Sequence, residues 1–245
     1  MKRLVQFGGP CLLLVFLGVP IVCAQEVAVT GQIEAGNRVA DKKSFDASNI
    51  VVWLTPISGS ASLHRMTATA RPPVRLAQRH KAFDPHVLAV EVGSAVEFPN
   101  YDPFFHNVFS FFEGKRFDLG LYEAGSKRTV IFDRPGISYL FCNIHPEMSA
   151  VVLVLKTPYF AVTGRRGGVR IADVPAGRYE FRVWDERSSP EELQSLTREV
   201  TISESAQSLG TVRLRETGEQ RPPHKNKYGR DYDNPKPPNS AYDQP

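Results

Sequence analysis

Residues 137–155 read Ile137-Ser-Tyr-Leu-Phe-Cys142-Asn-Ile-His145-Pro-Glu-Met148-Ser-Ala150-Val-Val-Leu-Val-Leu155 and carry the most informative pattern in the sequence. The two ends of this stretch, 137–142 and 150–155, are short runs rich in aliphatic and aromatic residues, which is typical of buried strands. The loop between them carries a thiol, an imidazole and a thioether. We therefore expect two strands of a β-sandwich that hold three potential metal ligands in a tight loop, because rigid elements keep such ligands in place.

A second imidazole, that of His106, lies 36 residues before Cys142. One thiolate, two imidazoles and one thioether form the ligand set of an electron-transfer copper site, in which a trigonal His₂Cys plane with a weak axial Met suits both Cu(I) and Cu(II). We therefore expect one type 1 copper ion per chain. His106, Cys142 and His145 would lie in the plane, and Met148 would be the axial ligand.

Other interpretations of the same residues are weaker. Zinc could bind the cysteine and the histidines, but a thioether is an unusual zinc ligand. Cys142 with His145 as its base would be a catalytic pair, yet the motif offers no oxyanion donors and no third orienting group. The structural alternatives are a buried inert thiol at Cys142, a half-buried strand histidine at His106 and a methionine that fills a core gap at Met148.

The first 24 residues have the three parts of a secretory signal, namely a basic start (Lys2, Arg3), an apolar run (11–19) and a small-residue cleavage site (22–24). Cleavage near Ala24 would leave Cys142 as the lone cysteine, which then cannot form an internal disulfide. A lipid anchor at Cys23 is disfavoured, because Val22 is larger than the residue such a site requires. We expect a periplasmic or secreted protein with no membrane span after cleavage.

Most of the chain reads as short strands separated by Gly, Pro, Asn and Asp, the pattern of an all-β sandwich. The expected strands are 27–33, 50–55, 74–78, 87–92, 95–99, 106–112, 129–132, 137–142, 150–155, 169–171, 178–184, 197–202 and 210–214. One short helix is expected at 191–197, after Pro190. Residues 59–73 predict a linker, and the polar, proline-rich residues 216–245 predict a disordered tail.

The segment 74–156 resembles a cupredoxin, the Greek-key β-sandwich of blue copper proteins. The resemblance rests on Phe83-Asp-Pro-His-Val-Leu-Ala-Val-Glu-Val-Gly-Ser-Ala-Val-Glu-Phe-Pro-Asn-Tyr-Asp102, on His106-Asn107-Val108 and on the loop Cys142-x-x-His145-Pro-x-Met148, which is similar to that of the amicyanin and plastocyanin type. One position departs from the family pattern, since Ile144 stands where a proline usually precedes the histidine.

The resemblance also implies roles for residues around the ligands. Asn107 would tie the two ligand segments together by hydrogen bonds. Electrons would enter and leave through the edge of His145, and Phe104, Phe105 and Pro146 would form the docking patch. The partners would be redox proteins that bind transiently through a small interface, for example a cytochrome or a dehydrogenase.

The flanking segments carry a second resemblance. Residues 29–33, 49–54 and 163–181 are similar to a carboxypeptidase-regulatory-like domain, a prealbumin-like or Ig-like β-sandwich. We therefore expect 26–58 plus 157–215 to form one discontinuous sandwich into which the copper domain is inserted, since insertion at a surface loop is tolerated when the ends of the guest are close together. The alternative is three consecutive β units. The combination also resembles exported methylamine-utilisation-like proteins.

These features predict an exported copper electron carrier that cycles between Cu(I) and Cu(II) and is not an enzyme. The alternatives are a periplasmic copper-delivery or storage protein with the same ligands, and a cell-envelope binding module with an accessory copper domain. The formal net charge is +4, and loss of Lys2 and Arg3 leaves +2, with acids and bases interspersed. This distribution lacks the concentrated basic face of a nucleic-acid-binding protein.

Overall fold

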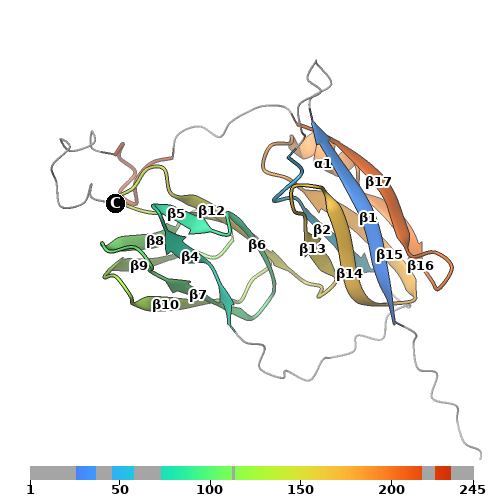
Figure 1. Cartoon of the computed structure of the whole chain (residues 1–245), viewed down its shortest axis with the longest axis horizontal. Helices are drawn as coiled ribbons and strands as arrows, with labels where there is room; N and C mark the ends of the chain where they lie inside the picture. The colour runs from blue at the N-terminus through green and yellow to red at the C-terminus, as the bar shows by residue number, and fades with distance from the viewer. Residues whose placement is uncertain (1–25, 37–45, 58–72, 112–113, 217–223, 233–245) are drawn as a thin grey trace, which may run out of the picture.

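The computed structural model describes residues 26–36, 46–57, 73–111, 114–216 and 224–232. The expected signal sequence, most of the expected linker and parts of the expected tail lie outside these ranges. Within them the protein is all-β, with seventeen strands and one short helix. Figure 1 shows two groups of sheets side by side, one built from the middle of the chain and the other from its two flanks. We call them the central sheets and the flanking sheets.

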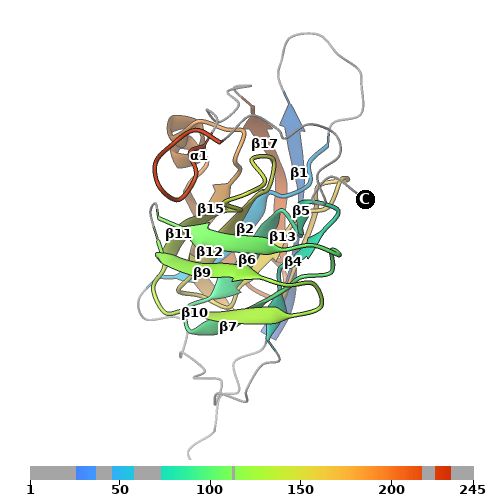
Figure 2. The same cartoon turned by 90° about the vertical axis from the view of Figure 1, so that its left-hand side faces the viewer.

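The central sheets form a sandwich that carries the expected metal ligands. Its larger layer is a five-stranded sheet in the order β6 (Val87–Glu91), β12 (Ser149–Leu155), β11 (Gly136–Phe141), β8 (His106–Ser110) and β9 (Phe117–Tyr122). The smaller layer has the order β10 (Lys127–Phe132), β7 (Ser94–Pro99) and β3 (Val74–Arg75). A hairpin of β4 (Ala77–Arg79) and β5 (Ala82–Asp84) completes it. Figure 2 shows the smaller layer lying below the larger one.

The flanking sheets combine strands from both sides of the central segment. One has the order β14 (Gly168–Pro175), β1 (Glu26–Gly36) and β17 (Ser208–Arg215), with β1 antiparallel to β14 and parallel to β17. The other has the order β13 (Phe160–Val162), β2 (Val51–Pro56), β15 (Gly177–Trp184) and β16 (Arg198–Ile202). The helix α1 (Pro190–Ser195) begins where the Ser189 side chain accepts a hydrogen bond from the Glu192 N–H.

The sequence of β12 is apolar at nearly every position because both faces of this strand are buried. Ala150, Val152 and Val154 belong to the core of the central sheets. The alternate residues Val151, Leu153 and Leu155 belong to a separate cluster that includes Trp184 of the flanking sheets. Because side chains alternate between the two faces of a strand, β12 is buried on both faces.

The same cluster joins the two groups of sheets. Trp53 of β2 packs against it, so both tryptophans serve this contact. A polar bridge lies nearby, where His86 Nε2 is 2.6 Å from a carboxylate oxygen of Glu186 and His86 Nδ1 is 3.0 Å from the carbonyl oxygen of Ser149. The flanking sheets therefore cover β6, β12 and β11 of the five-stranded sheet on the face opposite its own core.

The structure contains three strands that the sequence analysis does not predict, β5, β9 and β13. The case of β9 has a clear cause, because Asp118 and Gly120 interrupt it and both residues are typical of turns. Gly120 has φ +66°, and the pairing of β8 with β9 shifts register nearby. The glycine thus belongs to a β-bulge inside the strand and does not end it.

The structure also differs from the expected disordered tail at residues 224–232. These residues lie against the central sheets, far from the end of β17 (Figure 1). Composition alone does not predict this placement, because the partners of this segment lie about eighty or more residues earlier in the chain.

Candidate metal centre

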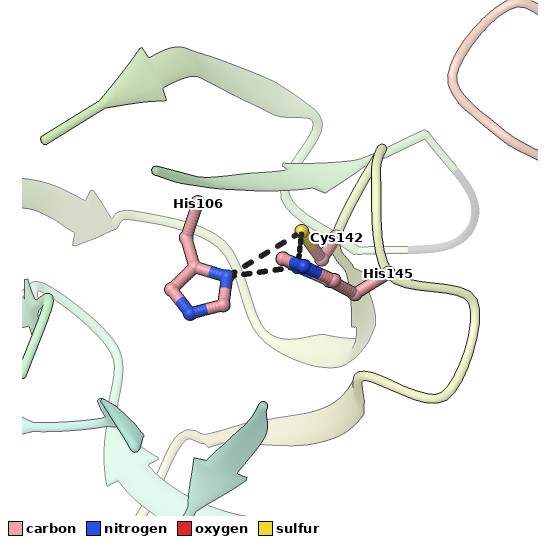
Figure 3. Close-up of side chains that lie close together, drawn as sticks. All are labelled: His106, Cys142 and His145. Atoms are coloured by element: carbon pink, nitrogen blue, oxygen red, sulfur yellow. Dashed lines mark hydrogen bonds between the residues drawn. The ribbon is translucent and has the colours of Figure 1, made fainter. Parts of the chain in front are cut away.

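Three of the expected ligands converge at one end of the central sandwich (Figure 3). His106 begins β8, Cys142 follows directly on β11, and His145 lies in the turn before β12. The distance from Nδ1 of His106 to Nδ1 of His145 is 3.1 Å, and Sγ of Cys142 lies 3.9 Å and 3.6 Å from these two nitrogens. All three residues are buried.

These distances fit a single metal ion. Bonds of about 2.0–2.3 Å from a central metal to N and S ligands place the ligand atoms roughly 3.3–4.0 Å apart in trigonal or tetrahedral geometry. The measured distances of 3.1, 3.6 and 3.9 Å are close to this range. Two bare imidazole nitrogens at 3.1 Å also repel each other unless a proton or a cation lies between them.

Asp102 decides which nitrogen of His106 faces the centre. Its Oδ2 lies 2.7 Å from Nε2 of His106, and the carboxylate is buried. A carboxylate only accepts hydrogen bonds, so Nε2 carries the proton and the lone pair of Nδ1 is free for a metal. The sequence analysis assigns no role to Asp102, although its position four residues before His106 was a signal that could have found it.

Asp102 is itself held by a tight turn. His80 and Lys81 both have φ +54° and connect β4 to β5 in the manner of a primed hairpin turn. Their N–H groups donate to the two oxygens of Asp102 at 2.6 Å and 3.0 Å. Burial alone would raise the pKa of Asp102, but the donors from Lys81, His106 and His80 hold this pKa below its usual value. The carboxylate therefore stays ionised beside His106.

Both imidazoles are neutral at ordinary pH. Burial and, to a smaller extent, the neighbouring His106 together lower the pKa of His145 to about 4. Burial also lowers the pKa of His106, although the hydrogen bond to Asp102 acts against this shift. Neutral imidazole is the form that binds a metal ion.

The sulfur of Cys142 lies among backbone donors. Burial raises the pKa of this thiol, while the N–H groups of Ile144, Asn107 and His145 hydrogen-bond to the sulfur and oppose the shift. A metal ion must therefore displace a proton from the sulfur, and the three N–H groups then stabilise the thiolate.

Asn107 connects the two ligand segments through its backbone. Its N–H reaches Cys142, as described above, while its side-chain Nδ2 donates to Asp118 Oδ1 at 2.7 Å and to the carbonyl oxygen of Gly120 at 2.9 Å. The side chain thus fixes β8 to β9, and the main chain reaches the ligand loop. Asn107 thus lies beside the three candidate ligands.

Met148 lies three residues after His145 and belongs to the core of the central sheets. It is fully buried in the same apolar cluster as Cys142. Its carbonyl oxygen accepts from the Cys142 N–H at 3.3 Å, and its own N–H donates to the carbonyl oxygen of His145 at 3.1 Å. These two hydrogen bonds close the ligand loop and bring Met148 back to Cys142.

Only two of the three residues of the expected docking patch lie at the surface. Phe105 is 44% exposed, and Pro146 is exposed. Phe104 is instead buried, with its ring centroid 5.1 Å from that of His106 and 5.6 Å from that of His145. Phe104 therefore packs against both imidazoles, and only Phe105 and Pro146 of the three are available at the surface.

Comparisons with known proteins give similarities in structure alone. No model of a known protein family matches this sequence, and no curated protein matches it either. Among solved structures, a purple cupredoxin from Nitrosopumilus maritimus is 22% identical, with 34% of this chain and 99% of that chain covered and a TM-score of 0.31. An oxidised mutant of amicyanin is 20% identical, with 34% and 82% covered and a TM-score of 0.32. A copper-containing nitrite reductase from Thermus scotoductus SA-01 is 25% identical, with 42% and 26% covered and a TM-score of 0.35.

Proposed function

We propose that this protein is an exported electron carrier with one type 1 copper ion, which His106, Cys142, His145 and Met148 would hold. The observation that carries the proposal is the buried trio of one sulfur and two imidazole nitrogens, separated by 3.1–3.9 Å. This donor set suits a copper ion that changes oxidation state with little rearrangement of its ligands.

The surroundings support electron transfer by limiting movement of the ligands. When bound, copper supplies the one-electron change. The protein holds His106 through Asp102, orders the sulfur of Cys142 with three N–H donors and packs Phe104 against both imidazoles. Ligands fixed in this way keep one geometry in both oxidation states, and their burial also favours retention of the ion over delivery to another protein.

We propose that redox proteins dock transiently at the surface around His145, with Phe105 and Pro146 in the contact. Their exposure near buried ligands supports this proposal. We further propose that 26–58 and 157–215 form one prealbumin-like domain that hosts the copper domain, which the pairing of β1 with β14 and β17 supports. Export to the periplasm or medium rests on residues 1–24. In the parts of the chain that the structure describes, no helical segment has the length and hydrophobicity to cross a bilayer.

The visible absorption spectrum of the copper-loaded, oxidised protein tests the function. A short Cu(II)–thiolate bond produces intense charge transfer, so we expect strong colour that Cys142→Ser abolishes. His80→Asn is the matched control, because the His80 side chain is exposed and Asn tolerates its positive φ. Colour that survives in Cys142→Ser would place the copper elsewhere and would overturn the proposal.

The reduction potential tests Met148. Replacement by Leu removes the thioether and retains an apolar side chain of similar volume. Because an axial donor favours the oxidised ion, Met148→Leu should retain copper and raise the potential measured by protein-film voltammetry. An unchanged potential would mean that Met148 acts only in packing.

A further inference from the structure

Residues 224–232 lie on the outside of the ligand loop, although the structure describes no strand or helix in them. The segment is drawn in red beside the end of the central sheets that carries the loop (Figure 1). The segment contacts the loop that contains Cys142, His145 and Met148. The contacting groups are the side chains of His224 and Tyr232 and the main-chain N–H of Lys227.

Three hydrogen bonds reach three successive parts of the loop. The hydroxyl of Tyr232 donates to the carbonyl oxygen of Cys142 at 2.7 Å. The N–H of Lys227 donates to Oδ1 of Asn143 at 3.0 Å. Nε2 of His224 lies 2.8 Å from the carbonyl oxygen of Pro146, which can only accept, so this nitrogen donates. The loop is thus contacted on both sides of His145.

Contacts between aromatic rings position the donor groups of His224 and Tyr232. The His224 ring stacks on Phe141, the residue before Cys142, with centroids 4.0 Å apart and planes at 28°. The Tyr232 ring meets the His224 ring edge-on at 5.2 Å, and its hydroxyl oxygen lies 3.1 Å from Nδ1 of His224. His224 and Tyr232 therefore pack together beside Phe141 at the end of β11.

An ion pair ties the segment to the other ligand-bearing strand. Nζ of Lys227 lies 2.8 Å from Oδ2 of Asp118, whose Oδ1 accepts from Asn107 at 2.7 Å. The hydrogen bond to Asp118 raises the pKa of Lys227, so this amine stays charged. Since Asn107 follows His106, the segment connects β9 and β8 on one side with the ligand loop on the other.

We propose that residues 224–232 form a strap that holds the metal-ligand loop closed, so that metal exchange requires the strap to be displaced first. Tyr232, Lys227 and His224 are positioning residues, because they act through the loop and do not touch the metal. The inference rests on the proposed function for the identity of the metal, but the hold on the loop is a property of the metal-free protein as well.

The reactivity of Cys142 in the metal-free full chain tests the strap directly. Cys142 is fully buried, so a thiol reagent reaches it only when the loop opens, and peptide mass mapping confines the measurement to this residue. The test variant is Tyr232→Phe, which keeps the ring and removes the donor to Cys142. The matched control is Tyr101→Phe, which makes the same change at a residue outside the strap that is 49% exposed.

We expect Tyr232→Phe to raise the labelling rate of Cys142 about fivefold, because one lost hydrogen bond changes an opening equilibrium by this order of magnitude. The triple variant His224→Ala, Lys227→Ala and Tyr232→Phe should exceed it. Tyr232→Phe should lower the melting temperature by only about 2–4 °C, since the contact that is lost on opening is also lost on unfolding, and the triple variant should lower it further. The same variants, loaded with Cu(I), should lose the ion faster to a competing chelator.

The outcomes separate the strap from the proposed function. Labelling of the triple variant at the rate of Tyr101→Phe would overturn the strap, even in a chain that binds copper and is coloured. A full chain that takes up no copper would overturn the proposed function, while faster labelling of Cys142 in the triple variant would still support the strap.

Discussion

The two halves of the metal centre are supported in different ways. His106 stands at the start of a strand and is fixed by Asp102, which is in turn held by the His80–Lys81 turn, all within the same compact part of the central sheets. Cys142, His145 and Met148 lie in a loop whose outer side is held by residues 224–232. The half that contains His106, the strand half, is thus held by a buried carboxylate and its hydrogen bonds, whereas the other half, the loop half, has its outer contacts with a segment about eighty or more residues further along the chain.

The largest expected effect is a loss of stability of the metal-free protein in acid, caused by His145 in the loop half. His145 has a pKa of about 4 in the folded protein, against an ordinary value of 6.5. The unfolded chain therefore binds more protons between these values, so the free energy of unfolding of the metal-free protein falls as pH drops from 6.5 to 4. The loss from His145 is at most about 3 kcal/mol. Denaturant unfolding across this pH range measures it.

His145→Gln is the control for the acid effect. It removes the titrating group, so the fall in stability between pH 6.5 and 4 should become smaller than in the unmodified protein. A pH dependence of the same size in both proteins would show that other groups cause it and would remove this difference between the two halves.

In the strand half, Asp102→Asn should weaken metal binding by His106. The amide can offer an N–H to Nε2 of His106, which then accepts, and the proton moves to the nitrogen that should bind the metal. We expect copper affinity to fall about 10- to 100-fold, as is usual for the loss of a hydrogen-bond partner of a ligating histidine. Competition with a chelator measures the affinity. Unchanged affinity would mean that the tautomer of His106 does not depend on Asp102.

The surface near the strand half should affect electron exchange without affecting the metal. Phe105 is 44% exposed, so Phe105→Glu should leave bound copper and the absorption spectrum unchanged. It should slow electron exchange with a redox protein roughly threefold or more, because the new charge must be desolvated on docking. Stopped-flow oxidation measures the rate, and Ile131→Glu, on β10 in the other layer and 58% exposed, is the matched control.

The smallest effect on metal retention is expected where the two halves are linked. Asp118→Asn removes the ion pair with Lys227 but keeps an oxygen that can accept from Asn107. Partly exposed ion pairs contribute about 1 kcal/mol or less, so copper loss to a chelator should accelerate by roughly fivefold at most. The acceleration should shrink in 0.5 M salt relative to low salt, on the order expected from screening. A larger change than Asp102→Asn causes would reverse the ranking of the two halves.

Several elements follow from short-range patterns in the sequence. The runs 137–142 and 150–155 are close to the observed strands β11 and β12, and the helix expected at 191–197 corresponds to α1 at Pro190–Ser195. Periodicity and turn residues predict such elements because they depend on neighbouring residues. Strand β9 was missed because Asp118 and Gly120 have the local chemistry of a turn, and only pairing with β8 makes them part of a strand.

Residue type and spacing are enough to identify the groups that could bind a metal, since Cys142, His145 and Met148 lie in one short loop. His106 is identified as well, because a second imidazole completes the ligand set of one thiolate, two imidazoles and one thioether. Tertiary structure alone decided that Asp102 selects the nitrogen of His106, that Phe104 is buried against both imidazoles and that residues 224–232 cover the loop. These features join atoms from distant parts of the chain, and their geometry depends on how the sheets pack, which local sequence patterns do not encode.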